Sequence, residues 1–399
     1  MPFRLFQSIA LFAALALVAG CSLERREQTS LRATQSSIPA ETLAAMESIG
    51  TDRNQPILIR AFKKESEIEI WKRTRSGNYA LMKTYPVCRW SGQLGPKLRE
   101  GDRQVPEGFY TVTPGQMNPN SALWLSFNVG YPNAMERALG RTGGDIMVHG
   151  TCSSRGCYAM TNEQMDEIYA VMREAFQGGQ KSVQFQSYPF RMSVKNLAKF
   201  RNDPNMPFWK NLKEGNDRFE VTKREMAVNY CGARYTFGAN DAPGCGETLA
   251  DPDAAAINAK LRDDEAKVAN LVSGGFSAAR MSYADGDQNI VFRDPAKKKL
   301  LETYAASGEF SRPEALAAVK EQRLDHKGNV IAETMITSTT DGSEPDPAST
   351  GAEAAITKTK TSKSKPSLFD QLFGTASPSD SDSDGLTTTG SVPLPQPRG

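Results

Sequence analysis

Short stretches of alternating apolar and polar residues follow one another along the first half of the chain and predict a sheet-rich domain. Each stretch contains β-branched or aromatic residues and is bounded by Gly, Pro, Asn or Ser, which is typical of strands and turns. The predicted strands cover residues 56–62, 67–71, 79–83, 109–112, 123–127, 145–148 and 183–185. Residues 75–78, Arg-Ser-Gly-Asn, predict the hairpin turn between the second and third strands. We therefore expect an α+β domain, mainly β, over residues 55–192.

One amphipathic helix interrupts this strand pattern. Residues 161–164, Thr-Asn-Glu-Gln, have the form of a capping box, in which the Thr and Gln side chains satisfy free N–H groups at the start of a helix. Apolar side chains then recur at helical spacing, at Met165, Ile168, Tyr169, Met172 and Phe176. Two glycines at 178 and 179 mark the end. The helix is expected to begin directly after Thr161.

The segments that follow this domain have other compositions. Residues 193–335 include two stretches of helical character, 205–223 and 251–272, and are expected to form a helical extension, either a packing appendage or a lid over substrate. Residues 336–399 contain mostly Ser, Thr, Asp, Pro and Gly, so a disordered low-complexity tail is expected. An apolar island at 368–373 is either a docking peptide or a chance cluster.

The N-terminal residues have the pattern of an export signal. Arg4 precedes an apolar run, residues 9–19, that is too short to cross a bilayer and leads into Cys21. The residues Val-Ala-Gly before that cysteine are typical of a lipoprotein signal peptide over residues 1–20, with Cys21 as the acylated residue. The alternative is an ordinary secretory signal with an incidental cysteine. Residues 21–54 are polar and are expected to be a flexible tether after the lipidated cysteine.

Export sets the expected location. Ser22 after the cysteine favours the outer membrane of a Gram-negative envelope, so we expect a lipoprotein on the periplasmic side of that membrane, held there by its lipid anchor. An ordinary secretory signal would also deliver the chain to the periplasm.

Charge and ligand spacing exclude several classes of function. The 48 Lys and Arg nearly balance the 46 Asp and Glu, so net charge gives no reason to expect a nucleic-acid partner. His326 lies in a polar stretch, and no paired His/Cys spacing of the zinc type occurs, so no metal or other cofactor is expected. No G-x-S-x-G elbow surrounds Ser153 or Ser154, which argues against a serine hydrolase.

Export also permits disulfides among the six cysteines. Cys231 and Cys245 bracket a loop rich in Gly, Asn, Asp and Pro and are the expected pair. The roles of Cys88 and Cys152 stay open, because Cys152 could line a pocket, pair or simply pack. A disulfide between Cys152 and Cys157 would contradict a catalytic role for Cys157, although the turn between them is short.

The most informative segment sets a histidine a few residues before a Gly-Cys pair. A nucleophilic thiol needs a base, a cation or a helix N-terminus nearby. His149 stands at the end of the predicted strand 145–148, and Cys157 follows Gly156 shortly before the predicted helix. We interpret Cys157 as a nucleophile, His149 as its base, and the backbone N–H groups of Gly156 and Cys157 as oxyanion donors. The alternative is a strand-end histidine satisfied by backbone and a buried thiol.

The same segment resembles the active-site motif of the L,D-transpeptidases of bacterial peptidoglycan, the YkuD-type catalytic domain, and most closely its YafK-like branch. The matching positions are His149, Gly150, Cys152, Ser154, Gly156, Cys157, Ala159, Met160 and Thr161. Further blocks that resemble the branch lie at 91–97, 100–102, 106–110, 118–121, 127–133 and 140–143. The resemblance covers about 56–231. It departs from the wider family at Arg155 and Ala159, where most members have His and Arg, and in a shorter loop between the histidine and the cysteine.

The resemblance implies an acyl transfer in two steps. The Cys157 thiolate, activated by His149, attacks an amide carbonyl on the L-centre of diaminopimelate in a peptidoglycan stem peptide. An amine then takes the acyl group, which is transpeptidation, or water takes it, which is hydrolysis of a bond such as that between a lipoprotein and peptidoglycan. A rival interpretation from another class is a non-catalytic, murein-binding lipoprotein.

Several neighbours could assist this chemistry. A main-chain carbonyl, or the hydroxyl of Thr151 or Ser153, could orient His149. Arg155, Arg141 and Lys97 could bind substrate carboxylates, although each of these residues is more often a solvated surface charge. Ser154 is either a hydrogen-bond donor to substrate or a turn residue.

Overall fold

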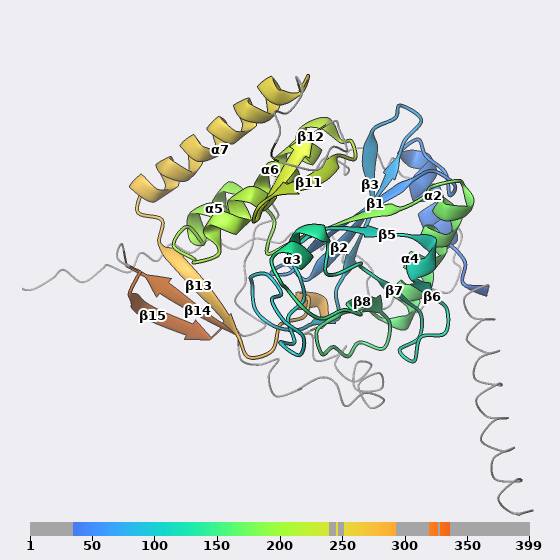
Figure 1. Ribbon diagram of the computed structural model, residues 1–399, viewed down its shortest axis with the longest axis horizontal. Coiled ribbons are helices and arrows are strands. Elements are labelled where there is room, and N and C mark those ends of the chain that lie inside the picture. Colours follow the sequence, from blue (N-terminus) through green and yellow to red (C-terminus); the bar gives the residue numbers. More distant parts are fainter. Residues whose placement is uncertain (1–34, 239–244, 246–250, 293–318, 326–327, 336–399) are drawn as a thin grey trace, which may run out of the picture. The chain divides into compact units, whose positions relative to one another are not determined.

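The computed structural model describes residues 35–238, 245, 251–292, 319–325 and 328–335 (Figure 1). The chain divides into two units, Met1–Thr357 and Lys358–Gly399, and every described residue belongs to the first. The predicted signal peptide with Cys21, His326, and the tail with its apolar island at 368–373 lie outside the described residues.

A mixed five-stranded sheet forms the centre of the domain. Its strands are β1 (Ile57–Phe62), β2 (Glu67–Arg73), β3 (Tyr79–Pro86), β5 (Gly108–Val112) and β10 (Val183–Tyr188). The order is β3-β2-β1-β10-β5, and β1 pairs with β10 in parallel while the other pairs are antiparallel. Every residue of β1 and β10 is buried, so apolar side chains must be covered on both faces of the sheet.

The first face of this sheet packs on a second, smaller sheet and one helix. The smaller sheet has the order β4-β9-β8-β7-β6, with β4 (Arg89–Trp90), β6 (Met117–Asn118), β7 (Ser126–Asn128), β8 (Met147–His149) and β9 (Tyr158–Ala159). The rings of Phe127 and Tyr158 lie 6.3 and 6.0 Å from that of Phe185 in β10. The helix α4 (Asn162–Gln177) begins with the predicted capping box, closed by Thr161 and Gln164. Two short helices, η1 (Pro114–Gln116) and α3 (Ala134–Ala138), lie in the connections.

One predicted strand begins later than expected. The apolar run at 123–127 predicted a strand over its whole length, whereas β7 covers Ser126–Asn128. Trp124 adopts a left-handed backbone conformation, with a φ of 72°, that a strand cannot contain.

The second face of the main sheet is covered by residues that come after the segment from His149 to Cys157 in sequence. These residues form α5 (Val194–Lys199), α6 (Met206–Thr222) and the hairpin β11 (Ala227–Cys231) and β12 (Arg234–Gly238), and α7 (Ala254–Ser273) packs on α5 and α6. The buried side chains Phe200, Trp209 and Phe219 share one apolar cluster with Leu58 and Phe62 of β1. This part of the extension therefore completes the main core.

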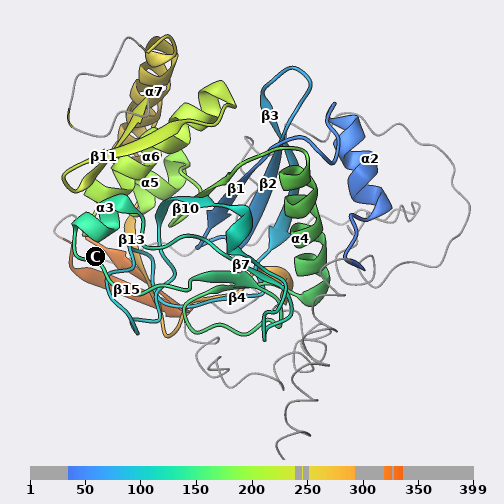
Figure 2. The ribbon, with the colours of Figure 1, turned by 45° about the vertical axis from the view of Figure 1, so that its right-hand side comes forward.

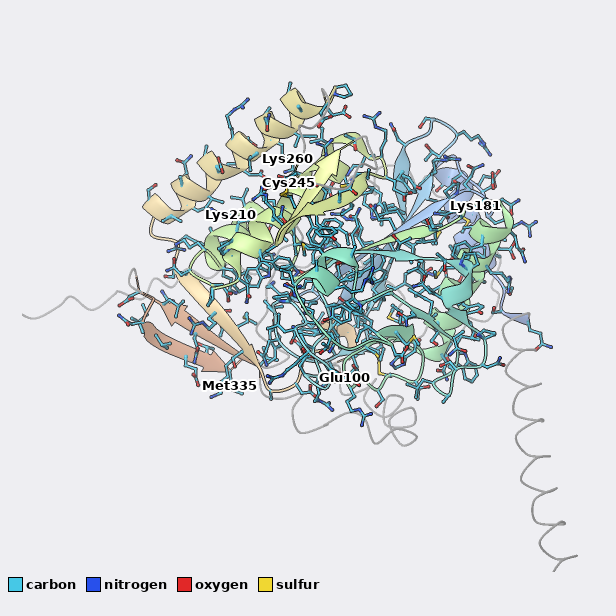
Figure 3. The ribbon with its side chains drawn as sticks, viewed as in Figure 1. Glu100, Lys181, Lys210, Cys245, Lys260 and Met335 are labelled. Atoms are coloured by element: carbon cyan, nitrogen blue, oxygen red, sulfur yellow. A yellow bond between two sulfur atoms is a disulfide. The ribbon has the colours of Figure 1, made fainter. Side chains whose placement is uncertain are left out.

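The prediction of a helical extension over 193–335 is wrong for two parts of it. Besides the hairpin β11–β12, a three-stranded sheet is present, with β13 (Ala278–Tyr283), β14 (Val319–Leu324) and β15 (Val330–Met335) in that order, and η2 (Ile290–Phe292) follows β13. These strands are short, β11 is half-buried throughout, and β15 is almost entirely exposed, so buried and exposed positions do not alternate along them as a strand prediction requires. Lys260 of α7, labelled in Figure 3, lies 2.9 Å from Asp264 and 3.9 Å from Asp217 of α6.

A fully buried ion pair joins the main sheet, α6 and the loop before β5. Lys63 Nζ lies 3.0 Å from Glu107 Oε1, and both side chains are completely buried. Lys63 also donates to the carbonyls of Gly95 and Val105, both at 3.0 Å. The Trp209 indole donates to Glu107 Oε2 at 2.8 Å. Because removal of one partner would leave a buried charge uncompensated, this pair fixes the position of the loop at 95–107.

The expected tether over 21–54 is wrong for its second half. Residues 40–48 form the helix α2 (Ala40–Ser48), which lies beside α4 in Figures 1 and 2. Thr42 Oγ1 donates to Glu167 Oε1 of α4 at 2.5 Å, and Met46 is 1% exposed in the main core. Upstream of α2, Arg173 Nη2 donates to the Ser36 carbonyl at 3.0 Å. Composition missed this docking because one buried methionine and a few polar contacts carry it.

We expect Met46→Ala to destabilise the protein by about 2–3 kcal/mol, since it removes a buried thioether side chain from the core and leaves a cavity. Leu43→Ala on the same helix is the matched control, because Leu43 is 40% exposed, and we expect it to cost less than about 0.5 kcal/mol. Urea-induced unfolding of both variants measures the difference. Equal effects would mean that α2 does not pack on the domain in solution.

Candidate active site

The histidine of the motif is buried and its orientation is fixed by the backbone. His149 ends β8 and lies between Ser126 of β7 and Ala159 of β9. Its side chain is 2% exposed, and Nδ1 lies 2.6 Å from the carbonyl oxygen of Gly150. A carbonyl can only accept, so Nδ1 carries the proton and Nε2 has the free lone pair of a base. Of the orienting groups considered from the sequence, a main-chain carbonyl is therefore the one observed.

The cysteine of the motif lies on the neighbouring strand. In the parallel pair β8–β9, His149 is opposite Ala159, so the register extended by two residues places Cys157 opposite Met147. The Met147 N–H donates to Cys157 Sγ at 3.4 Å, and Sγ lies 3.9 Å from the Asp145 carbonyl. Side chains two residues apart on a strand share a face, and paired residues do too. The register therefore brings Cys157 and His149 to one face of the smaller sheet.

The turn before Cys157 is held by one buried hydroxyl. Ser154 Oγ donates to the Cys157 carbonyl at 2.7 Å and accepts from the Cys157 N–H at 3.1 Å and the Gly156 N–H at 3.3 Å. The predicted oxyanion donors, the N–H groups of Gly156 and Cys157, both donate to Ser154 in this structure, and their role toward substrate stays a prediction. Ser154 itself is fully buried and is the turn residue of the two alternatives.

The loop between His149 and Cys157 contains strained backbone. Thr151 and Cys152 are both left-handed, with φ of 72° and 46°, a conformation that is costly for a β-branched residue such as threonine. The Thr151 N–H donates to Asn162 Oδ1 at 2.9 Å, and the Cys152 N–H donates to the Met160 carbonyl at 3.1 Å. A disulfide also joins Cys152 to Cys88, which precedes β4. Several independent contacts therefore hold this loop in its strained form.

The disulfides resolve what the sequence left open. Cys88 pairs with Cys152, and the expected pair Cys231–Cys245 is confirmed. Among the cysteines in the described residues, Cys157 is the free one. The disulfide that would have contradicted catalysis, between Cys152 and Cys157, is therefore not formed.

The thiol and the imidazole are both neutral at rest. Burial raises the pKa of the Cys157 thiol above its ordinary value, while the Met147 N–H and the charges of Lys97 and Arg155 act in the opposite direction. Burial lowers the pKa of His149 to about 4, opposed by its hydrogen bond with Gly150. The structure also places the two-residue strand β9 between Cys157 and α4, so the thiol does not directly precede the helix as expected. The arrangement suits a base that takes the thiol proton during attack.

We expect the buried His149 to make the protein less stable in acid. The pKa of His149 is depressed from 6.5 to about 4, so the unfolded chain binds this proton first. The contribution is therefore present above pH 6.5 and is lost as the pH falls toward 4, by about 3 kcal/mol. Urea-induced unfolding at pH 7 and pH 4, for wild type and His149→Gln, measures it. The wild type should lose about 3 kcal/mol more than the variant; equal losses would contradict a neutral, buried His149.

The predicted carboxylate-binding residues have different surroundings. Lys97 is nearly buried, pairs with Asp102 and donates to the Arg99 carbonyl at 2.9 Å. Arg141 Nη1 lies 3.3 Å from the buried Glu136. Arg155 is exposed beside Gly156. Lys97 and Arg155 both act on the pKa of Cys157 and so lie near it, whereas Arg141 is held by an internal carboxylate.

Sequence reasoning missed three groups that shape the site. Met147 and Asp145 contact the sulfur through their backbone, which no side-chain pattern reveals. Ser91 Oγ donates to Ser154 Oγ at 2.9 Å across 63 residues of sequence.

In the part of the chain that the structure describes, no three His, Cys, Asp or Glu side chains gather in a way that could hold a metal ion. No helix within that part is long and apolar enough to span a membrane.

Comparisons with known proteins place this geometry in a family. The model of the YkuD L,D-transpeptidase catalytic domain matches residues 62–183. The candidate L,D-transpeptidase YafK of Escherichia coli K12 is 42% identical over 180 residues, which cover 45% of this chain and 73% of the relative. YafK of Escherichia coli O157:H7 gives the same figures, 42% over 180 residues.

Two solved structures are also similar. The helical cell shape determining protein Pgp2 of Campylobacter jejuni is 14% identical with a TM-score of 0.28, covering 73% of this chain and 99% of that one. Bd1075 of Bdellovibrio bacteriovorus is 12% identical with a TM-score of 0.23, covering 62% of this chain and 78% of that one.

Proposed function

Because this chain belongs to the L,D-transpeptidase catalytic-domain family, we propose that it is a cysteine acyltransferase acting on diaminopimelate-containing stem peptides of peptidoglycan. The observation that supports this most is the pairing of a free Cys157 with His149 on one face of the smaller sheet. The hydrogen bond from His149 Nδ1 to the Gly150 carbonyl leaves Nε2 as the base.

In the first step the Cys157 sulfur attacks the carbonyl carbon of the amide on the L-centre of diaminopimelate. His149 Nε2 takes the thiol proton as the carbon–sulfur bond forms. His149 then returns this proton to the leaving amine as the carbon–nitrogen bond breaks, and a thioester on Cys157 remains. A neutral thiol and a neutral imidazole at rest fit this order of proton transfers.

In the second step a nucleophile attacks the thioester carbonyl and gives its proton to His149, which returns the proton to the departing sulfur. An acceptor amine makes a new peptide bond, as in a crosslink or the attachment of a lipoprotein. Water instead completes a hydrolysis, for example the release of a peptidoglycan-linked lipoprotein. Both outcomes share one acyl-enzyme and differ only in the second nucleophile.

Substrate binding is proposed to involve the cations nearest the sulfur. Lys97 and Arg155 are close enough to stabilise negative charge at Cys157, and each could attract a carboxylate of the stem peptide. Arg155 is the more exposed of the two, because Lys97 is nearly buried. Arg141 would have to leave Glu136 to reach substrate.

Location is part of the proposal. We propose that Cys21 is acylated, becomes the first residue once residues 1–20 are removed, and anchors the chain to the periplasmic side of the outer membrane, where peptidoglycan is within reach. Globomycin treatment and Cys21→Ala should each block the lipoprotein pathway. In both experiments residues 1–20 should not be removed by that pathway, and the mature anchored form should not appear. An unchanged, membrane-bound product in both experiments would contradict acylation at Cys21.

The test of the activity is muropeptide analysis by mass spectrometry. The purified chain is incubated with peptidoglycan that carries tetrapeptide stems and with peptidoglycan that carries a bound lipoprotein, in parallel with Cys157→Ala. New crosslinks with loss of terminal D-Ala would identify a transpeptidase. Release of lipoprotein or of an amino acid without a new bond would identify a hydrolase. Identical product patterns for wild type and variant would contradict the enzymatic role and favour the interpretation as a murein-binding lipoprotein.

A further inference from the structure

Residues 283–289, here called the strap, lie alongside the loop at 87–93 in space, although about 190 positions separate the two segments in sequence. The strap leaves β13 and leads to η2. Backbone hydrogen bonds run from Trp90 to Asp287 at 3.0 Å, from Gly286 to Gly92 at 2.8 Å and from Asn289 to Val87 at 3.0 Å. The loop at 87–93 includes β4, the strand that pairs with β9 directly after Cys157.

Gly286 shows how tightly the strap lies on this loop. Its φ is +71°, and a Cβ atom there would lie 2.0 Å from the Trp90 carbonyl oxygen and 2.6 Å from Ser91 Cα. Only glycine allows such an approach of two backbones. The strap is therefore packed against the loop itself and not only against its side chains.

The first connection from the strap to the nucleophile passes through Ser91. Its hydroxyl donates to Ser154 Oγ at 2.9 Å. Ser154 Oγ in turn holds both the N–H and the carbonyl of Cys157. A shift of the loop at 87–93 would therefore move the hydroxyl on which the turn before Cys157 depends.

The second connection passes through Asp285 and Arg103. Asp285 is 3% exposed, and its carboxylate pairs with Arg103 through Nε, at 3.2 Å, and Nη2. The Asp285 carbonyl also accepts from Arg89 Nη2 at 2.6 Å. The Arg103 backbone lies next to the turn before Cys157, since a Cβ atom on Gly156 would lie 3.6 Å from Arg103 Cα. Arg103 is itself left-handed, with a φ of 54°, so its backbone needs outside support.

We infer that the strap is part of the catalytic framework and that Asp285 is a positioning residue, which holds Arg103 against Gly156 and thereby keeps Cys157 in place beside β8. The strap lies well outside residues 62–183, which the family model matches. The C-terminal extension would thus supply a support that the matched catalytic segment lacks. The kinetic consequence of this inference rests on the proposed function, whereas its structural consequence does not.

The kinetic test uses the full chain with Arg103→Met, Asp285→Asn and the double variant. Arg103→Met breaks the ion pair but leaves Asp285 beside Arg89, so it keeps the test open if Asp285→Asn folds poorly. Per folded molecule, we expect each single variant to lower kcat about 10- to 100-fold with KM changed by less than about threefold. The double variant should be no worse than the worse single one, because the two residues act as one unit.

The matched control is Glu321→Gln. Glu321 in β14 pairs with Lys199 of α5 at 2.7 Å, so this change weakens the extension without touching the loop at 87–103. We expect its kcat to equal that of wild type. Normal kcat in Arg103→Met and Asp285→Asn, or an equal loss of kcat in the control, would overturn the inference while leaving the proposed function intact.

A readout without substrate separates the two ideas. Hydrogen–deuterium exchange of peptides covering 150–160 should become at least about tenfold faster in Arg103→Met than in wild type, and should be unchanged in Glu321→Gln. Exchange reports local opening of backbone hydrogen bonds such as those that Ser154 makes. Unchanged exchange in Arg103→Met would overturn the inference even if wild type turned over none of the peptidoglycan substrates.

Discussion

Cys157→Ala is expected to form no covalent acyl-enzyme and to lower kcat by a factor on the order of 10⁴ or more. In the proposed mechanism the sulfur receives the acyl group, so its removal would eliminate the intermediate shared by transfer and hydrolysis. The measurement is intact-mass analysis after rapid mixing with stem peptide, together with turnover. Wild type should gain the mass of the acyl group, and the variant should not.

Cys157→Ser is the matched control for this prediction. It keeps the size of the side chain and a polar atom near the Met147 N–H, which lies 3.4 Å from Sγ in the wild type. A serine hydroxyl is far less acidic than a thiol, so His149 should activate it poorly and turnover should also fall. Both variants should unfold at nearly the wild-type denaturant concentration. Turnover at the wild-type rate in either folded variant would mean that Cys157 is not the nucleophile.

Replacement of Cys88 and Cys152 by serine is expected to destabilise the protein by about 4 kcal/mol. The two cysteines are 64 residues apart, and a disulfide that closes a loop of this length lowers the entropy of the unfolded chain and so raises the free energy of the unfolded state by about that amount. Because Cys152 and Thr151 are left-handed, the loop should also relax once the link is lost, and kcat should fall about tenfold or more. Urea-induced unfolding and turnover of the folded fraction measure the two effects.

The second disulfide provides the comparison. Cys231 and Cys245 are 14 residues apart, so replacing both by serine should cost about 3 kcal/mol. This link joins the last residue of β11 to Cys245, and within the described part of the chain neither cysteine forms a hydrogen bond with His149 or Cys157. The value of kcat per folded molecule should therefore stay at that of wild type. If both double variants lost kcat to the same extent, the Cys88–Cys152 link would have no specific effect on the active-site loop.

The sequence predicted those parts of the site that depend on local pattern. The capping box at Thr161 and Gln164 places the start of α4, and the apolar run before His149 predicts β8, because both signals lie within a few residues of the structure they determine. The family motif predicts that His149 and Cys157 act as a pair. The structure pairs β8, which ends at His149, with β9, which directly follows Cys157. The same local reasoning placed the turn before Cys157 but could not show which atom holds it.

The parts that sequence reasoning missed depend on contacts between distant residues. The sequence leaves Ser154 as either a substrate-binding residue or a turn residue, because its partner Ser91 is 63 positions away. The link between Arg103 and Asp285 spans 182 positions, and nothing near either residue indicates it. The polar composition of residues 21–54 predicts a tether and does not reveal helix α2, because the packing of this helix depends on one buried methionine and one hydroxyl. Strands β13 to β15 gave weak alternation, since each is stabilised mainly by its neighbours.

The docking of residues 36–48 on the domain would limit its distance from a membrane if the chain is lipid-anchored as proposed. If Cys21 is acylated, the span that separates the lipid from the folded body ends at Ser36, which Arg173 already holds. A fully extended chain over residues 22–35 reaches at most about 50 Å, whereas a tether that continued to residue 54 would have reached about 110 Å. The catalytic face would therefore sweep a shallow layer of the cell wall next to the membrane, and only bonds within that layer would be open to it.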